Sequence, residues 1–344
     1  MPVRNEAGFI SRSLSAVLAQ DYPRDLLEVI VVDGMSTDGT REFVTASQAR
    51  HAGLRLLDNP NGIVATGLNL ALLQASGEII VRVDGHCEIA PDYVSRCVEH
   101  LLEEDIDGVG GPIETIGETP RARVIALAMS SRFGVGGAAF RTVKDRRMFV
   151  ETVAFPAYKR RVIESAGPFD EELVRNQDDE YNYRLRKSGG RLLLAPDVRS
   201  RYYSRGSISS LWNQYLQYGY WKVRVMQKHP LQMRLRQFVP PLFVACLFIT
   251  LLMSFFSAAG RWSLGFVAGC YLIANFVASV SEAHRGEGGP TLLLLPIVFG
   301  ALHLAYGAGF LTGLARFWGR WGEAQHLPNN FMTRRPEPEG LEEV

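Results

Sequence analysis

Three long stretches without a charged residue constrain the fold of this chain most. They cover residues 238–260, 262–281 and 288–315. Each is close to or longer than the ~20 residues that a helix needs to cross the hydrocarbon core of a bilayer. A buried helix of a soluble protein can imitate one such stretch, but three in succession are typical of a membrane protein. We therefore expect residues 238–315 to form a membrane region of about three helices.

The sequence before residue 237 is mixed and charged. The formal net charge of the whole chain is only +1, so there is no basic field and nucleic acid is not an expected partner. The four cysteines have no Cys-x-x-Cys spacing, which predicts a reducing compartment without a disulfide framework. Arg4, Glu6 and Arg12 interrupt the amino terminus, so we expect no cleavable signal peptide.

Short apolar runs alternate with helical patterns over the first hundred residues. Strands are expected at 28–32, 54–57 and 79–84, and helices at 8–20, from 36 onward and at 65–74. This alternation is typical of a parallel α/β sheet with right-handed crossovers. No apolar run precedes residues 1–6, so we expect the chain to begin within a shortened first strand.

Carboxylates follow the ends of two of these strands. Asp33 ends the strand at 28–32, and Asp84 ends a later one and is followed by Gly85 and His86. Open α/β sheets bind their ligands at the carboxyl ends of the strands, so acidic residues there indicate a cation, a sugar or a ribose. Asp84 and His86 are possible metal ligands on one turn. The alternative is an ordinary Asp-Gly turn between strand and helix.

The region from 108 to 160 is less regular. Its glycines between 108 and 137 predict loops that could cover a site, and 151–158 is expected to be extended. A helix follows at about 176–188, with Asp178, Asp179 and Glu180 in its first turn. A rigidly held carboxylate at that position suits a general base. The alternative is helix capping and compensation of the helix dipole.

Residues 206–237 combine aromatic and basic side chains. This composition predicts a helix at the membrane interface, and the alternative is an ordinary aromatic packing face. The basic residues that precede the first apolar stretch favour a cytoplasmic catalytic part. Three crossings would then place Arg316 and Arg320 outside. Either one segment is re-entrant near Pro296, or the positive-inside tendency fails.

Four segments, in this order, resemble the family 2 glycosyltransferases, which have the GT-A nucleotide-diphosphosugar-binding fold. They are Pro2-Val3-Arg4-Asn5-Glu6, Val31–Thr40, Val83-Asp84-Gly85-His86 and Gln177-Asp178-Asp179-Glu180. The likeness extends over residues 1–225 and lies in order and spacing as much as in any single motif. Residues 32–40 and the apolar tail are most similar to membrane-anchored glycosyltransferases of succinoglycan-type exopolysaccharide assembly.

The resemblance implies a GT-A catalytic domain at 1–205, an interfacial segment at 206–237, the membrane region at 238–315 and a polar tail at 316–344. It implies that Asp178 is the catalytic base, and that Asp84 and His86 hold a divalent cation, Mn²⁺ or Mg²⁺. The residues implied to contact the nucleotide sugar are Val3, Glu6, Asp33, Asp84, Gly85, Gln217 and Trp221.

The chain departs from the family pattern at several positions. Gly34 replaces a second aspartate after Asp33, and Thr66 replaces an arginine. His86 replaces the second aspartate of Asp-x-Asp; imidazole can ligate manganese, whereas magnesium prefers oxygen. Tyr220 replaces the arginine of a Gln-x-x-Arg-Trp box, which argues against a processive synthase.

The implied activity is inverting transfer of a sugar, with glucose from UDP-glucose as the first guess, to a polyprenyl-diphosphate-linked oligosaccharide. Such a reaction belongs to the assembly of exopolysaccharide or another cell-surface glycan. The implied setting is a bacterial-type inner membrane with the catalytic domain in the cytoplasm. The alternatives are transfer to polyprenyl phosphate, processive polysaccharide synthesis and, from another class, a catalytically silent membrane scaffold that binds nucleotide sugars.

Overall fold

A computed structural model describes residues 1–284 and 289–322. The chain divides into two compact units. The first contains Met1–Ile113 and Val143–Tyr202, and the second contains Glu114–Thr142 and the described residues from Tyr203 onward. Beyond residue 322, the expected polar tail lies outside the described residues, as does position 288 at the start of the third apolar stretch.

Two sheets form the centre of the first unit. The first is parallel and has the order β1 (Pro2–Val3), β2 (Val29–Asp33) and β3 (Leu54–Asp58). The second has the order β4 (Ile79–Val81), β9 (Ala154–Lys159), β6 (Gly108–Gly111), β10 (Leu192–Leu194) and β8 (Met148–Phe149). A parallel sheet is thus confirmed for β1–β3. It is wrong for β4, the strand expected at 79–84, which belongs to the second sheet and runs antiparallel to β9.

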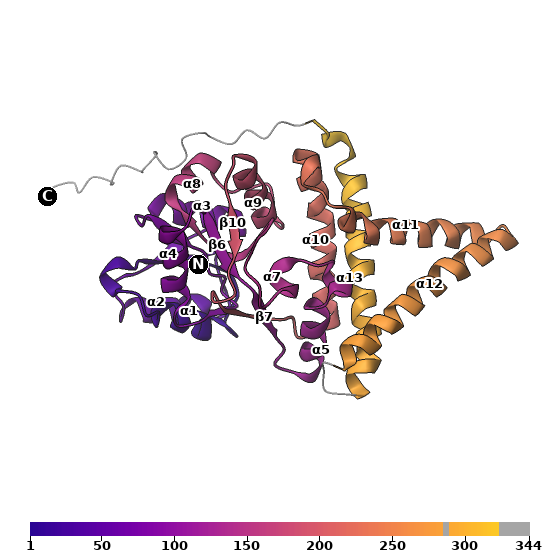
Figure 1. The fold of residues 1–344 in the computed structure, drawn as a ribbon, viewed down its shortest axis with the longest axis horizontal. Helices are drawn as coiled ribbons and strands as arrows, with labels where there is room; N and C mark the ends of the chain where they lie inside the picture. Colours follow the sequence, from indigo (N-terminus) through magenta and orange to yellow (C-terminus); the bar gives the residue numbers. More distant parts are fainter. Residues whose placement is uncertain (285–288, 323–344) are drawn as a thin grey trace. The chain divides into compact units, whose positions relative to one another are not determined.

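A further strand, β5 (Cys87–Ile89), pairs antiparallel with β11 (Ser200–Tyr203). The end of β11 and β7 (Ile113–Ile116) lie where the chain passes between the units. The helices of the first unit surround its strands (Figure 1). They are α1 (Ile10–Leu18), α2 (Thr40–Gln48), α3 (Val64–Gln74), α4 (Tyr93–Glu103), α8 (Arg160–Ala166) and α9 (Gln177–Lys187), with a short 3₁₀ turn at Arg24–Leu26. The helices expected near residues 8, 36, 65 and 176 are confirmed.

The loop expected from the glycines at 108–111 is wrong, because these residues form strand β6. All four of its residues are buried, and β6 lies between β9 and β10. A Cβ atom on Gly108 would come within 2.7 Å of side-chain atoms of both Leu192 and Tyr158. A Cβ on Gly111 would overlap with the carbonyl of Val198. Glycine is therefore required here by close packing on a central strand, and flexibility is not the reason.

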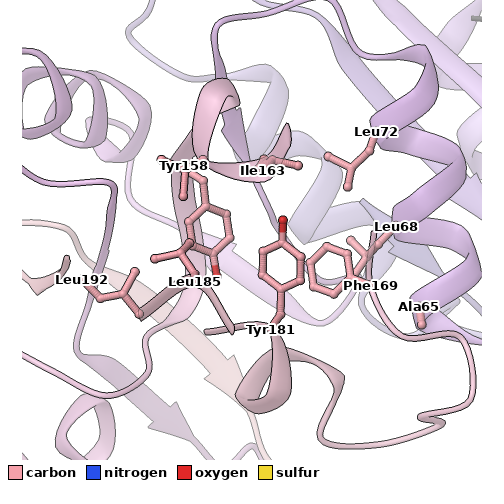
Figure 2. Close-up of a cluster of buried hydrophobic side chains, with 10 residues drawn as sticks. Ala65, Leu68, Leu72, Tyr158, Ile163, Phe169, Tyr181, Leu185 and Leu192 are labelled. Atoms are coloured by element: carbon pink, nitrogen blue, oxygen red, sulfur yellow. The ribbon is translucent and has the colours of Figure 1, made fainter. Parts of the chain in front are cut away.

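An aromatic cluster attaches α9 to the rest of the first unit (Figure 2). Phe169 stacks on Tyr181 of α9, with ring centroids 4.1 Å apart, and Tyr158 of β9 lies 5.8 Å from the same ring. Aliphatic residues of α3, α8, α9 and β10 complete the cluster; they are Ala65, Leu68, Leu72, Val162, Ile163, Leu185 and Leu192. Burial of these side chains fixes the position of α9, and with it the acidic first turn.

The second unit is helical. Its helices are α5 (Pro120–Met129), α6 (Arg132–Val135), α7 (Ala139–Thr142), α10 (Ile208–Lys228), α11 (Leu235–Ser254), α12 (Ala258–Ala283) and α13 (Gly289–Arg316), with 3₁₀ turns at Pro230–Gln232 and Trp318–Arg320. Among the described residues, three helices are long and apolar enough to cross a membrane, at Leu235–Ser254, Ala258–Ala283 and Thr291–Arg316. The expectation of three such helices is confirmed.

Helices α10 and α13 lie side by side (Figure 1) and touch at the level of their backbones. A Cβ on Gly219 of α10 would overlap with the carbonyl of Tyr306, and one on Gly309 of α13 would overlap with the carbonyl of Leu216. Gly313 lies against the backbone of Tyr220 in the same way. Small residues with this spacing allow the close approach of two helices. The helix expected within 206–237 is confirmed as α10.

Two buried tyrosines of the aromatic cluster provide a stability test. Among the described residues, the Tyr181 hydroxyl has no hydrogen-bond partner, whereas the Tyr158 hydroxyl donates to Asn182 Oδ1 at 2.5 Å. Removing an unpaired buried hydroxyl raises the free energy of unfolding by about 1 kcal/mol. Removing a paired one lowers it by about 1 kcal/mol, because an acceptor is left unsatisfied. We expect Tyr181→Phe to raise, and Tyr158→Phe to lower, the midpoint of thermal unfolding of the full chain in detergent. A lower midpoint for Tyr181→Phe would mean that an ordered water pairs with its hydroxyl.

Candidate active site

Arg82 links two carboxylates that are far apart in the sequence. Its Nε donates to Asp84 Oδ1 at 2.9 Å, and its Nη2 donates to Asp84 Oδ2 at 3.2 Å. Its Nη1 lies 3.4 Å from Asp178 Oδ2. The Arg82 side chain is 7% exposed, while those of Asp84 and Asp178 are 21% and 43% exposed. The network therefore extends from a buried positive charge to a carboxylate that solvent reaches.

Each charge of this network stabilises the ionised form of its partner. Burial alone would lower the pKa of Arg82, but the charges of Asp178 and Asp84 raise it above its ordinary value. Burial alone would raise the pKa of Asp84, but the charges of Arg82 and His86 and the hydrogen bond from Arg82 hold it below its usual value. Arg82 and Asp84 are thus both charged at neutral pH, and the two carboxylates leave an excess of negative charge that suits a cation.

The acidic first turn of α9 divides into different environments. Glu180 is fully buried and binds Arg184 Nε at 2.6 Å, so it is part of a local ion pair. Asp178 instead faces Arg82. The helix-capping alternative for Asp178 is wrong, because α9 begins at Gln177 and its N-cap position is Asn176. The structure thus separates Asp178 from Glu180 by what each carboxylate contacts.

Val3, Glu6, Gly85 and His86 come together beside this network. His86 Nδ1 lies 2.8 Å from Glu6 Oε1. A Cβ on Gly85 would lie 2.8 Å from Glu6 Cγ and 3.1 Å from Val3 Cγ1, so only glycine fits between them. Burial alone would lower the pKa of His86, but its hydrogen bond to Glu6 and the nearby charges of Glu6 and Asp84 raise it to about 9. Without a further ligand, His86 is therefore an imidazolium at neutral pH.

Asp33 lies at the end of β2 with its carboxylate fully buried. Ser36 Oγ donates to its Oδ1 at 2.5 Å, and Arg41 Nη1 donates to its Oδ2 at 3.2 Å. Arg41 also binds Asp58 at the end of β3, at 2.6 Å. The buried carboxylate of Asp33 therefore holds Ser36 and Arg41 in place.

Side chains after β2 hold the loop that carries Glu6. The backbone N–H of Asn5 donates to Ser36 Oγ, and that of Glu6 donates to Thr40 Oγ1, at 2.9 and 2.8 Å. Ala7 N–H donates to Asp38 Oδ2 at 2.9 Å. Through these bonds the segment from 36 to 40 fixes the backbone that presents Glu6 to His86.

Backbone strain surrounds the same residues. The non-glycine residues with positive φ in the described chain are Asn5, Met35, Phe155 and Asn176, with φ between 47° and 64°. Asn5 precedes Glu6, and Asn176 precedes the turn that carries Asp178. Phe155 precedes Pro156, whose carbonyl accepts the backbone N–H of Arg82 at 2.9 Å. Such conformations cost of order 1–3 kcal/mol each and cluster at functional sites.

Gln217 and Trp221, the remaining predicted site residues, lie on α10 in the second unit. The Trp221 ring packs against Tyr220 and Phe317, with centroids 5.5 and 5.8 Å apart. In the same helix, Arg224 is buried and its Nη1 donates to the carbonyl of Arg320. Arg224 therefore binds the 3₁₀ turn that follows α13.

A cation would find few protein ligands in the first unit. Among the described residues, no group of three or more His, Cys, Asp or Glu side chains has a geometry that could hold a metal ion. The donors on the Asp-Gly-His turn are the carboxylate of Asp84 and the imidazole of His86. One or two protein ligands are usual for a cation that also binds the phosphates of a substrate.

A family model described as Glycosyl transferase family 2 matches residues 1–167. The chain carries a family 2 glycosyltransferase domain. The match includes the loop with Glu6, the end of β2 and the Asp84-Gly85-His86 turn. It ends before α9, which carries Asp178.

Full-length relatives extend this likeness. The glycosyltransferase is 29% identical to succinoglycan biosynthesis protein ExoA of Rhizobium meliloti over 321 residues, which cover 92% of this chain and 94% of the relative. It is 28% identical to a dolichyl N-acetyl-alpha-D-glucosaminyl phosphate 3-beta-D-2,3-diacetamido-2,3-dideoxy-beta-D-glucuronosyltransferase of Methanococcus voltae, over 66% of this chain and 73% of the relative.

A solved structure supports the fold. The mannosyltransferase PcManGT of Pyrobaculum calidifontis, in complex with GDP-Man and Mn²⁺, superposes with a TM-score of 0.56 at 22% sequence identity. The comparison covers 91% of this chain and 85% of that one. The expected GT-A fold followed by apolar helices is confirmed.

Sequence reasoning missed Arg82 as a site residue of this glycosyltransferase. The signal was present, because Arg82 is the one charged residue in the otherwise apolar run Ile79–Val83. A charge inside such a run is buried at a cost unless it is paired. Its partners could not be read from the sequence, since one of them, Asp178, comes from a distant helix.

Removing the shared guanidinium tests the network. Arg82→Met should lower the free energy of unfolding by about 2–4 kcal/mol, because it leaves charged Asp84 in a partly buried site without its partner. Adding Asp84→Asn to this variant should recover part of the loss. The matched control is Arg96→Met, which removes an exposed arginine paired with Glu99 and should leave the midpoint of thermal unfolding unchanged. Equal midpoints for Arg82→Met and the parent would contradict the network.

Proposed function

We propose that this glycosyltransferase moves a sugar from a nucleotide diphosphate to a hydroxyl of a polyprenyl-diphosphate-linked oligosaccharide, with inversion at the anomeric carbon. The observation that carries the proposal is the Arg82 network, which joins Asp84 of the Asp-Gly-His turn to Asp178 of α9. A donor site and a base for the acceptor must lie this close for direct displacement. The dolichyl-linked substrate named for the Methanococcus relative supports a lipid-linked acceptor.

Asp178 is the proposed base. Its carboxylate is partly exposed, so an acceptor hydroxyl can reach it, and Arg82 fixes its orientation. The hydroxyl gives its proton to Asp178 as its oxygen attacks the anomeric carbon, and the nucleoside diphosphate leaves from the opposite face. One base and no covalent intermediate are sufficient for this displacement. Arg82 touches both carboxylates and acts as a positioning residue.

The donor set fits a divalent cation held by Asp84 and His86. The His86 Nδ1 atom is bound to Glu6, and metal-ligating histidines usually bond a carboxylate through the nitrogen that does not face the metal. Nε2 of His86 then remains as the ligand atom, and an imidazole ligand favours Mn²⁺ over Mg²⁺. When bound, the cation would neutralise the charge that develops on the leaving diphosphate. Asp84 would give up part of its contact with Arg82 in exchange.

The remaining predicted contacts divide between the units. Val3, Glu6, Asp33 and Gly85 would shape the nucleotide site in the first unit, with Asp33 acting through Ser36 and Arg41. Gln217 and Trp221 of α10 stay predicted contacts of the donor. We propose UDP-glucose as the first donor to test and GDP-mannose as the second. We also propose that the catalytic domain lies on the cytoplasmic face of a bacterial-type inner membrane, because basic residues precede α11.

Replacing the base gives the decisive test. Asp178→Asn should lower transfer by about 10²–10⁴-fold, the usual share of a general base, and leave nucleotide-sugar binding nearly intact. The assay is nucleotide release from membranes that contain the full chain, with native lipid extract, Mn²⁺ and a panel of nucleotide sugars. Asp179→Asn, one residue along α9, is the matched control and should keep most activity.

Other outcomes of this assay separate the alternatives. Normal turnover by Asp178→Asn, or a larger loss with Asp179→Asn, would exclude Asp178 as the base. Nucleotide binding without release for every donor would favour the silent scaffold. Release that does not depend on lipid extract would contradict the lipid-linked acceptor.

The Glu6–His86 pair makes the cation testable. Chelation with EDTA should abolish release, and Mn²⁺ should restore it. Glu6→Gln should raise the Mn²⁺ concentration for half-maximal activity by about 10-fold or more, because partners behind a metal ligand typically contribute that much to affinity. Glu28→Gln, which alters a carboxylate bound to Ser76 and Gly77 away from this site, is the control. An unchanged Mn²⁺ dependence in Glu6→Gln would exclude His86 as a ligand held by Glu6.

A further inference from the structure

The three long apolar helices of the second unit differ in how much protein covers them. In the most apolar part of each, 6% of α11 and 11% of α12 is buried, against 44% of α13. Most side chains of α11 and α12 are therefore not covered by the protein. The third resembles a helix packed inside a protein.

Helix α13 packs against α5 and α6, which carry exposed charges, and against α10. Its first half contacts α5 and α6, where His303 Nε2 donates to the carbonyl of Phe133 at 2.8 Å. Its second half packs against α10 through the glycine contacts described above. Exposed arginines lie on α5 and α6, at 121, 123 and 132, and Lys228 ends α10. If α13 crossed the bilayer, α5, α6 and α10 would accompany it into the hydrocarbon, where exposed charges are strongly unfavourable.

Helices α11 and α12 form a hairpin that extends away from α13 (Figure 1). Near the tip, large apolar side chains are exposed, such as Phe248 at 60%, Phe256 at 88% and Phe266 at 73%. The 20 residues of α11 give a length of ~30 Å, which matches the hydrocarbon core of a bilayer. Arg261 and Trp262 follow the turn, and both residue types suit a membrane–water boundary.

We propose that α11 and α12 cross the bilayer as a hairpin and that α13 does not cross it. Helix α13 lies along the membrane interface instead, with α5, α6 and α10 on its water-facing side and exposed apolar side chains such as Leu293 and Ile297 toward the lipid. The partner of the hairpin is the hydrocarbon of a lipid bilayer. This inference does not depend on transfer activity.

A polar network joins α12 to α13. The Tyr271 hydroxyl donates to His303 Nδ1 at 3.0 Å, since His303 Nε2 is the donor to Phe133. Asn275 Nδ2 donates to the carbonyl of Pro296 at 3.0 Å and also contacts the Tyr271 hydroxyl. The network thus attaches the middle of α12 to α13.

This arrangement resolves the conflict over charge that the sequence presents. With two crossings, the segments before α11 and after α13 lie on the same side of the membrane. Arg234 and Arg236 precede α11, and Arg316 and Arg320 follow the apolar part of α13. All four then obey the positive-inside tendency, and no segment has to be re-entrant at Pro296.

Cysteine labelling of the full chain in sealed vesicles tests the proposal. Ser209→Cys, Ala259→Cys and Gly319→Cys place thiols before α11, at the hairpin tip and after α13. Ser209 and Ala259 are exposed, and a Cβ on Gly319 meets no atom within 4 Å. A membrane-impermeant maleimide is applied to inside-out and right-side-out vesicles, with detergent-permeabilised vesicles as the reference. The parent chain, which has Cys246 and Cys270 in the hairpin, gives the background.

We expect Ser209→Cys and Gly319→Cys to react in the same vesicle orientation and Ala259→Cys only in the opposite one. Reaction of Gly319→Cys and Ser209→Cys in opposite orientations would mean that α13 crosses, and would overturn the proposal. Reaction of all three in one orientation would mean that the hairpin does not cross, for example because a second copy covers it. Gly206→Cys, Ala258→Cys and Trp318→Cys report the same three positions if a first variant fails to reach the membrane.

Discussion

The burial of one positive charge governs the arrangement of the first unit. Arg82 lies at the end of an apolar strand, where a guanidinium is stable only if carboxylates approach it. Asp84 is supplied by the same turn, but Asp178 must come from α9. The requirement to pair this charge therefore joins the end of β4 to a helix that follows much later in the chain. The pairing of Arg82 with Asp84 and Asp178 thus holds β4, the Asp-Gly-His turn and α9 together.

Apolar packing positions α9, the helix that carries Asp178 toward Arg82. The stacked rings of Phe169 and Tyr181, with Tyr158 beside them, hold α9 against β9 and α3. Non-directional burial fixes where α9 lies, and the ion pairs of Asp178 and Glu180 fix its rotation. The strained residues Asn5, Phe155 and Asn176 persist because such packing surrounds them.

Much of this fold could be predicted from the sequence, for physical reasons that differ between elements. The helices and the strands β2 and β3 follow from hydrophobic periodicity, which is a local signal. Strand β6 could not be predicted, because its glycines are required by the side chains of Leu192 and Tyr158, which approach from other strands. The grouping of Glu6, Asp84, Gly85 and His86 was anticipated by resemblance. The role of Arg82 as their neighbour depends on tertiary pairing that no local pattern encodes.

The backbone contact between α10 and α13 has a consequence for how the membrane acts on this glycosyltransferase. Gly219, Gly309 and Gly313 leave no room for side chains between the two helices, so the helices move together. Gly307 lies equally close to Pro240 at the root of the hairpin. A bilayer thinner or thicker than the hairpin would tilt it to relieve hydrophobic mismatch. That tilt would reach Gln217 and Trp221 as a rotation of α10, so that lipid thickness becomes a mechanical input to the helix predicted to contact the donor.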